Sequence, residues 1–196
     1  MKINKKTEKG KNKEKSGGLY EEIEVPNGII AELDNDFLIT RKENNIIKRK
    51  LNPLINIKIE GNKIVISSKR TRKTEKKLIG TFIAHIKNMI KGLTEGFKYK
   101  LQISNVHFPM NVTYDKTKNE LVIKNFLGEA KERRIKLVPE VDVKIDKDII
   151  EIKSFDIEKA GLTSTIIEKE TRVRNKDRRI YQDGIFLIEK PSRSYL

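Results

Sequence analysis

The residues best suited to chemistry in this sequence are basic and lie near its C-terminal end. Four arginines and one lysine fall between Arg172 and Arg179, with Asp177 as the only acid among them. A guanidinium group can bind two phosphate oxygens at once and can stack on an exposed base, and an RNA contact surface requires both kinds of contact. We expect Asp177 to pair with a neighbouring arginine. The predicted RNA-binding residues of this region are Arg172, Arg174, Asn175, Lys176, Arg178, Arg179, Tyr181, Lys190 and Arg193.

A second basic run begins at Lys69 and continues through Arg70, Arg72 and Lys73. Two further lysines follow it, and Glu75 is its only acid. Clusters of one charge sign repel internally, so a phosphate partner would stabilise this run. The alternative is an ordinary solvated surface.

Catalytic chemistry has little support in the sequence. An RNA-cleaving enzyme needs an acid and a base that converge on one phosphate, but His85 and His107 fall in different predicted domains. The chain contains no cysteine, and it lacks a P-loop, a dinucleotide fingerprint, a nucleophile elbow and metal-ligand spacing. The sequence therefore predicts a non-enzyme without cofactor, metal or small-molecule substrate.

The charge of the chain indicates a polyanionic partner. Its 196 residues include 43 Lys+Arg and 28 Asp+Glu, which gives a net charge of +15. Such an excess suits phosphate neutralisation and counterion release on nucleic acid. No apolar run approaches the roughly 20 residues of a membrane span, and the start is polar and Lys-rich, so we expect a cytosolic protein without a membrane partner.

Two segments repeat the same pattern and align without a gap. Residues 55–68 and 141–154 both show apolar alternation, a polar turn and apolar alternation again. This period of two predicts a β-hairpin in each segment. Each hairpin pattern is then followed by a helical pattern, which indicates a duplicated sheet-plus-helix unit.

The first helical pattern covers residues 74–91, with apolar residues at helical spacing and Gly92 as the predicted stop. The second covers residues 156–173, with Asp156 as its predicted N-cap. The second half of the chain also predicts strands at residues 98–104, 110–114 and 121–126. A tight turn at Asp183-Gly184 is expected to join residues 179–181 to a strand at 185–188.

These patterns predict an α+β fold of two tandem duplicated domains, each a mainly antiparallel sheet packed with one helix. The expected boundaries are a disordered basic tail at 1–18, domains at 19–96 and 97–190, and a C-terminal tail at 191–196.

Several ordered blocks of the sequence resemble a known family. The blocks are Ala84–Lys100, Val106–Met110, Asn125–Glu129, Val173–Asp177 and Asp183–Phe186. They resemble the ribosomal protein L6 family of the large subunit, in its archaeal and eukaryotic branch, which is called L9 in eukaryotes. The resemblance extends from about residue 20 to residue 190. It departs from the family at 40–45, where relatives usually carry a Gly-Pro-x-Gly turn.

The resemblance implies a structural role on cytoplasmic ribosomes. It implies that the C-terminal domain makes the main rRNA contact, near the sarcin-ricin loop and the site of translational GTPases, among neighbouring ribosomal proteins. The positions that match the family's contact region are Arg172, Asn175, Lys176, Asp177, Arg179, Asp183 and Gly184. Asp183 and Gly184 are expected to shape a turn. The alternative hypothesis is a free-standing RNA-binding module that acts on tRNA or mRNA.

Overall fold

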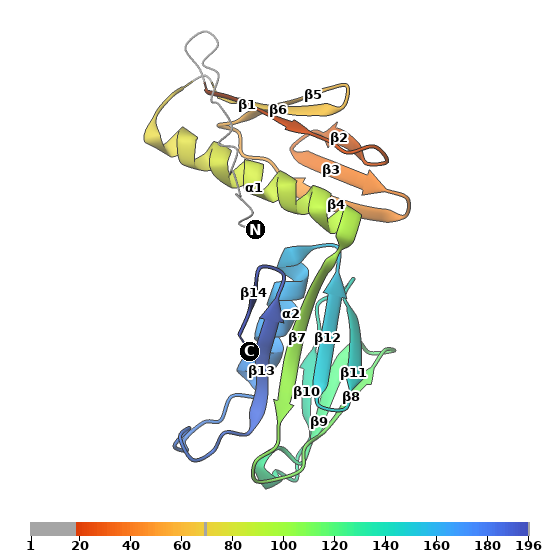
Figure 1. The fold of residues 1–196 in the computed structure, drawn as a ribbon, viewed down its shortest axis with the longest axis vertical. Helices are drawn as coiled ribbons and strands as arrows, with labels where there is room; N and C mark the ends of the chain where they lie inside the picture. Colours follow the sequence, from red (N-terminus) through yellow and green to blue (C-terminus); the bar gives the residue numbers. More distant parts are fainter. Residues whose placement is uncertain (1–18, 69, 196) are drawn as a thin grey trace, which may run out of the picture. The chain divides into compact units, whose positions relative to one another are not determined.

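The computed structural model describes residues 19–68 and 70–195. The predicted basic tail, Lys69 and Leu196 lie outside these ranges. The described residues form two compact units that divide between Leu93 and Thr94, and each unit is described by itself (Figure 1). Antiparallel strands with one long helix in each unit confirm the predicted α+β class.

The N-terminal unit contains two three-stranded antiparallel sheets, ordered β1-β6-β5 and β2-β3-β4, and the helix α1. Apolar residues from the helix and from both sheets form its core, among them Ile86, Ile64 and Leu38. The elements are β1 (Leu19–Glu24), β2 (Ile30–Asp34), β3 (Phe37–Lys42), β4 (Asn45–Lys50), β5 (Asn56–Glu60), β6 (Lys63–Ser68) and α1 (Lys73–Glu95).

The first predicted hairpin is confirmed. Strands β5 and β6 pair antiparallel with Ile57 opposite Ile66, and Gly61 adopts φ +58° in the turn. At the position where the sequence departs from the family, β3 and β4 are joined by a two-residue turn with Lys42 opposite Asn45.

Helix α1 is confirmed, but its predicted stop at Gly92 is wrong. The helix passes through Gly92 and ends at Glu95, and Gly96 at φ +72° is where the backbone leaves the helix. Gly92 and Leu93 are both buried in the core. The extra turn therefore gains apolar burial for Leu93, which outweighs the low helix propensity of one glycine.

The C-terminal unit contains a five-stranded sheet, ordered β11-β12-β7-β13-β14, and a three-stranded sheet, ordered β10-β9-β8. Helix α2 packs against β7, β12 and β13 (Figure 1). The elements are β7 (Phe97–Ser104), β8 (Asn111–Asp115), β9 (Glu120–Lys124), a 3₁₀ turn (Phe126–Gly128), β10 (Arg133–Lys136), β11 (Asp142–Asp146), β12 (Ile149–Ser154), α2 (Ile157–Glu170), β13 (Gly184–Lys190) and β14 (Arg193–Ser194).

The second hairpin and its helix are also confirmed. Strands β11 and β12 pair antiparallel, and the Asp156 carboxylate caps α2 by accepting the Glu158 N–H at 2.8 Å. The helix ends at Glu170 rather than at Val173. Beyond it the Arg172 N–H donates to the Lys169 carbonyl, and Val173 leaves the helix and packs into the core.

The predicted tight turn at Asp183-Gly184 is wrong. Residues 179–181 form no strand, and Gly184 is the first residue of β13, opposite Ser104 of β7. The Asp183 side chain is bonded to the segment after β7 instead of closing a local turn. A long loop therefore replaces the expected hairpin, and this loop carries the predicted RNA-binding residues between Arg172 and Tyr181.

Candidate nucleic-acid interface

The basic loop, defined as residues 172–182, connects the end of α2 to the start of β13. Thr171 fixes both ends, because its hydroxyl oxygen donates to the Ile167 carbonyl at 2.9 Å and accepts the Ile185 N–H at 3.2 Å. Thr171 is 1% exposed and Val173 is 7% exposed. The loop therefore starts and ends on buried, hydrogen-bonded backbone.

Asp177 sets the shape of the loop. Its carboxylate accepts the Arg179 N–H at 2.9 Å, and its carbonyl accepts the N–H groups of Ile180 and Tyr181. Asn175 adopts the left-handed conformation at φ +58°, which asparagine tolerates. The carboxylate thus organises the backbone and does not form the expected ion pair with a neighbouring arginine.

The arginines of the basic loop are exposed, and they have no acidic partner among the described residues. Within residues 70–195, none of Arg172, Arg174, Arg178 and Arg179 forms an ion pair. Arg133 of the same unit, in contrast, makes two hydrogen bonds to Glu129, at 2.8 and 2.5 Å. The guanidinium groups of the loop are therefore available for an external anion.

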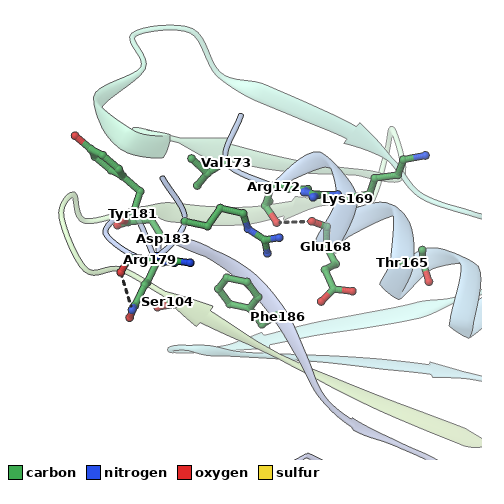
Figure 2. Close-up of a pocket in the computed structure, with 13 residues that line it drawn as sticks. Ser104, Thr165, Glu168, Lys169, Arg172, Val173, Arg179, Tyr181, Asp183 and Phe186 are labelled. Atoms are coloured by element: carbon green, nitrogen blue, oxygen red, sulfur yellow. Dashed lines mark hydrogen bonds between the residues drawn. The ribbon is translucent and has the colours of Figure 1, made fainter. Parts of the chain in front are cut away.

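Three of these arginines line an open pocket of about 800 Å³. Figure 2 shows the Arg179 side chain extending into this pocket, with Phe186 of β13 and Glu168 of α2 on other walls. The pocket is lined by Ser104, Thr165, Glu168, Lys169, Thr171, Arg172, Val173, Arg178, Arg179, Tyr181, Gln182, Asp183 and Phe186.

Asp183 ties the end of the basic loop to the segment after β7. One carboxylate oxygen accepts the N–H groups of Val106 and His107, both at 2.9 Å, and the other accepts the His107 Nδ1–H at 2.6 Å. The side chain is 2% exposed. Burial raises the pKa of Asp183, but the hydrogen bonds from His107 and Val106 outweigh it and hold that pKa below its ordinary value.

Two aromatic rings meet beside this anchor. The rings of His107 and Tyr181 stack with centroids 4.9 Å apart and an interplanar angle of 29°. The Lys176 ammonium lies 4.4 Å from the centre of the Tyr181 ring. Two predicted residues, Lys176 and Tyr181, are thereby brought together with a histidine that the sequence reasoning assigned to no site.

Lys190 and Arg193 lie apart from the pocket. Both cations lie near the Tyr195 ring, at 5.4 and 5.0 Å from its centre. Lys190 ends β13, whereas Gly184 begins it, so roughly 20 Å of extended strand separates Lys190 from the basic loop.

The second predicted basic group belongs to the N-terminal unit. Arg70, Arg72 and Lys73 are exposed where α1 begins, and Lys69 lies outside the described residues. The Thr74 hydroxyl donates to Glu75 at 2.6 Å, and this bond, with help from the charges of Arg72 and Arg70, lowers the pKa of Glu75.

The two histidines also lie in different units. His85 is hydrogen-bonded to Arg49 at 2.8 Å and packs edge-on against Phe82. Within the described ranges no group of acidic and histidine side chains is arranged to hold a metal ion, and no helix is long and apolar enough to cross a membrane.

Sequence reasoning missed Thr165, Glu168 and Lys169, which line the α2 side of the pocket. With the predicted residue Arg172 they are spaced at i, i+3, i+4 and i+7, which places all four on one face of the helix and its continuation. The apolar pattern had drawn attention to the opposite, buried face. The regular spacing of these polar residues along the helix is the sequence signal that could have predicted this side of the pocket.

Exposed arginines around a pocket, on an α+β chain of net charge +15, are typical of basic nucleic-acid-binding proteins. A family model described as Ribosomal protein L6 matches residues 25–96. Two relatives, each named Large ribosomal subunit protein uL6, are similar to this chain. The one from Methanococcus vannielii is 39% identical to it, and the one from Haloarcula marismortui is 38% identical. Each alignment covers 88% of this chain. It covers 94% of the Methanococcus protein and 96% of the Haloarcula protein.

A third relative of the same name, from Methanothrix thermoacetophila, is 40% identical over 86% of this chain and 95% of its own length. The chain therefore belongs to the ribosomal protein L6 family. The predicted resemblance to the archaeal and eukaryotic branch of the family is confirmed, and these relatives are archaeal. The relatives are named as proteins of the large ribosomal subunit, which agrees with the prediction that the chain is not an enzyme.

Proposed function

We propose that this chain is a structural constituent of the large ribosomal subunit on cytoplasmic ribosomes, and that its C-terminal unit binds rRNA through the basic loop. The observation that carries the proposal is a set of exposed arginines on a loop held by backbone hydrogen bonds. Among the described residues these arginines have no acidic partner. The names of the relatives support the ribosomal assignment.

The chemistry of the loop suits folded RNA. Each guanidinium that meets a phosphate releases condensed counterions, which favours binding and makes it depend on salt. Because the loop is anchored at Thr171 and Asp183, little conformational entropy is lost when RNA binds. The RNA segment proposed here is the region of the sarcin-ricin loop, close to the site of translational GTPases and to neighbouring ribosomal proteins.

The start of α1 offers a second phosphate contact. Its exposed residues Arg70, Arg72 and Lys73, with Lys69 beside them in sequence, have Glu75 as their nearest acid in the chain, and that carboxylate is buried. We assign this group an auxiliary role, because the pocket lined by Arg172, Arg178 and Arg179 belongs to the other unit.

Sedimentation tests the proposed function. A cell lysate is run through a gradient at high salt, which releases loosely held electrostatic passengers. The chain is expected to migrate with the large subunit. If it stays at the top of the gradient with tRNA or mRNA, the free-standing RNA-binding module is the correct function instead.

Two variants, each with five substitutions, test the basic loop. Incorporation into large subunits is expected to fall steeply when alanine replaces Arg172, Arg174, Lys176, Arg178 and Arg179. A control variant removes the same charge elsewhere on the unit, with alanine in place of the exposed residues Lys116, Lys118, Lys136, Lys144 and Lys147. Equal incorporation of the two variants would refute the assignment of the loop.

A further inference from the structure

We propose that Tyr181 and His107 form a stacking platform for one unpaired base of the bound RNA. This inference rests on the proposed function and assigns a part of that interface to base contact rather than phosphate contact. It also gives a role to the block Val106–Met110, which the family resemblance singled out without explaining it.

The two rings stack on each other. Their centroids are 4.9 Å apart and their planes differ by 29°, which is an offset-stacked arrangement. His107 remains 32% exposed and Tyr181 is half-buried. The pair therefore presents a flat aromatic surface that solvent still reaches, which is what an unstacked base needs.

The Lys176 side chain lies over the Tyr181 ring. Its ammonium lies 4.4 Å from the ring centre, and within residues 70–195 it forms no ion pair with a carboxylate. A base that stacks on Tyr181 would displace this ammonium. The displaced cation would then be free to bind the phosphate of the same nucleotide.

Asp183 holds the platform in place. Both of its carboxylate oxygens are used, one by the two backbone N–H groups of Val106 and His107 and the other by the imidazole of His107. The ring of His107 is therefore fixed before RNA arrives. Preorganisation of this kind reduces the entropy lost on binding.

The surroundings favour nucleic acid as the ligand. Tyr181 also borders the pocket lined by Arg172, Arg178 and Arg179, and Figure 2 shows its ring directed away from the Arg179 side chain. A nucleotide could therefore stack its base on the Tyr181 ring while neighbouring phosphates bind the guanidinium groups of the adjacent pocket. Aromatic rings interleaved with basic groups are the usual design of single-strand RNA contacts.

The experiment separates stacking from charge by using two probes. One is an oligoadenylate, and the other is an abasic ribose-phosphate oligomer of the same length, which has the same phosphates but no bases. The variants Tyr181→Ala and His107→Ala are expected to bind oligoadenylate about 5- to 150-fold more weakly. Their affinity for the abasic oligomer and the slope of log affinity against log salt should stay unchanged, because no phosphate contact is lost.

The matched control is Tyr195→Ala. Tyr195 also lies beside two cations, Lys190 and Arg193, and is 49% exposed, but no aromatic ring stacks on it among the described residues. It should leave binding to both probes unchanged. Tyr181→Phe should retain the binding of the original chain, because stacking requires the ring and not the hydroxyl.

A spectroscopic readout detects stacking directly. The chain has no tryptophan, so Tyr181→Trp introduces a single reporter. Oligoadenylate is expected to quench its fluorescence, and the abasic oligomer is not. Adding His107→Ala to this variant should reduce the quenching.

Equal losses of affinity for both probes, or no quenching of Trp at position 181, would overturn the platform. Urea unfolding of each variant shows whether a loss of binding reflects a loss of folding. The proposed ribosomal function fails separately, in the sedimentation and incorporation assays described above.

Discussion

Replacing Asp183 with alanine is expected to destabilise the C-terminal unit by about 2–4 kcal/mol. Three hydrogen bonds would be lost, from the backbone N–H groups of Val106 and His107 and from the His107 ring. Hydrogen bonds to a charged group contribute about 1.5–3 kcal/mol each when well buried. Val106 and His107 are exposed residues, so water partly replaces the lost acceptor. Each of the three bonds is therefore expected to contribute only about 1 kcal/mol, the net value of an ordinary hydrogen bond.

The Asp183→Asn variant isolates the charge. Its amide oxygen can still accept the two backbone N–H groups, but its amide nitrogen would face His107 Nδ1 and the negative charge is gone. We expect a loss of about 1–2 kcal/mol. The difference between Asp183→Asn and the original chain should depend on pH in a defined direction.

The direction follows from the lowered pKa of Asp183. A carboxyl whose pKa is lower in the folded state stabilises the fold fully above its unfolded pKa, about 4, and loses that contribution as pH falls through the folded pKa. The stability difference between the original chain and Asp183→Asn should therefore be constant above about pH 5 and shrink below about pH 4.

Urea unfolding followed by circular dichroism, repeated from pH 3 to pH 7, measures these quantities. The control is Asp115→Asn. Asp115 also accepts a backbone N–H at 2.9 Å, from Thr117, but it does so in a solvated turn, so its replacement should cost less. A loss in Asp183→Ala no larger than in this control, or a stability difference that does not change with pH, would refute the reasoning.

Three further substitutions test the helices, each by thermal or urea unfolding. Gly80→Ala should stabilise α1 by up to about 1 kcal/mol, because Gly80 is mid-helix and an added Cβ meets nothing within 4 Å. Gly161→Ala should not stabilise α2 in the same way, because its added Cβ would lie 3.2 Å from the Tyr99 hydroxyl oxygen. Asp156→Ala should cost about 1 kcal/mol by removing the cap of the Glu158 N–H; an unchanged midpoint would contradict it.

Local patterns were sufficient to predict most of the fold. The hairpins β5–β6 and β11–β12 each place alternating apolar residues around a short polar turn, so neighbours in sequence decide the structure. The stop at Gly92 failed for a non-local reason. The burial of Leu93 against residues far along the chain decides where α1 ends, and a local glycine signal cannot report it.

The candidate site shows the same division. The run of arginines between 172 and 179 is visible in the sequence, and the structure places it on an exposed loop. Its anchor is not visible, because Asp183 and His107 are separated by 76 positions. Asp-Gly followed by an apolar run predicts a tight turn, and only tertiary contacts show that this aspartate serves a distant segment instead.

The unpaired arginines have a consequence for salt dependence. Glu168 lies four residues before Arg172 and lines the same pocket, yet no ion pair joins them among the described residues. The basic loop is held by hydrogen bonds to Thr171, Asp177 and Asp183 rather than by contacts between surface charges. Added salt should therefore weaken RNA binding strongly without loosening the loop, because screening removes phosphate contacts but leaves backbone hydrogen bonds intact.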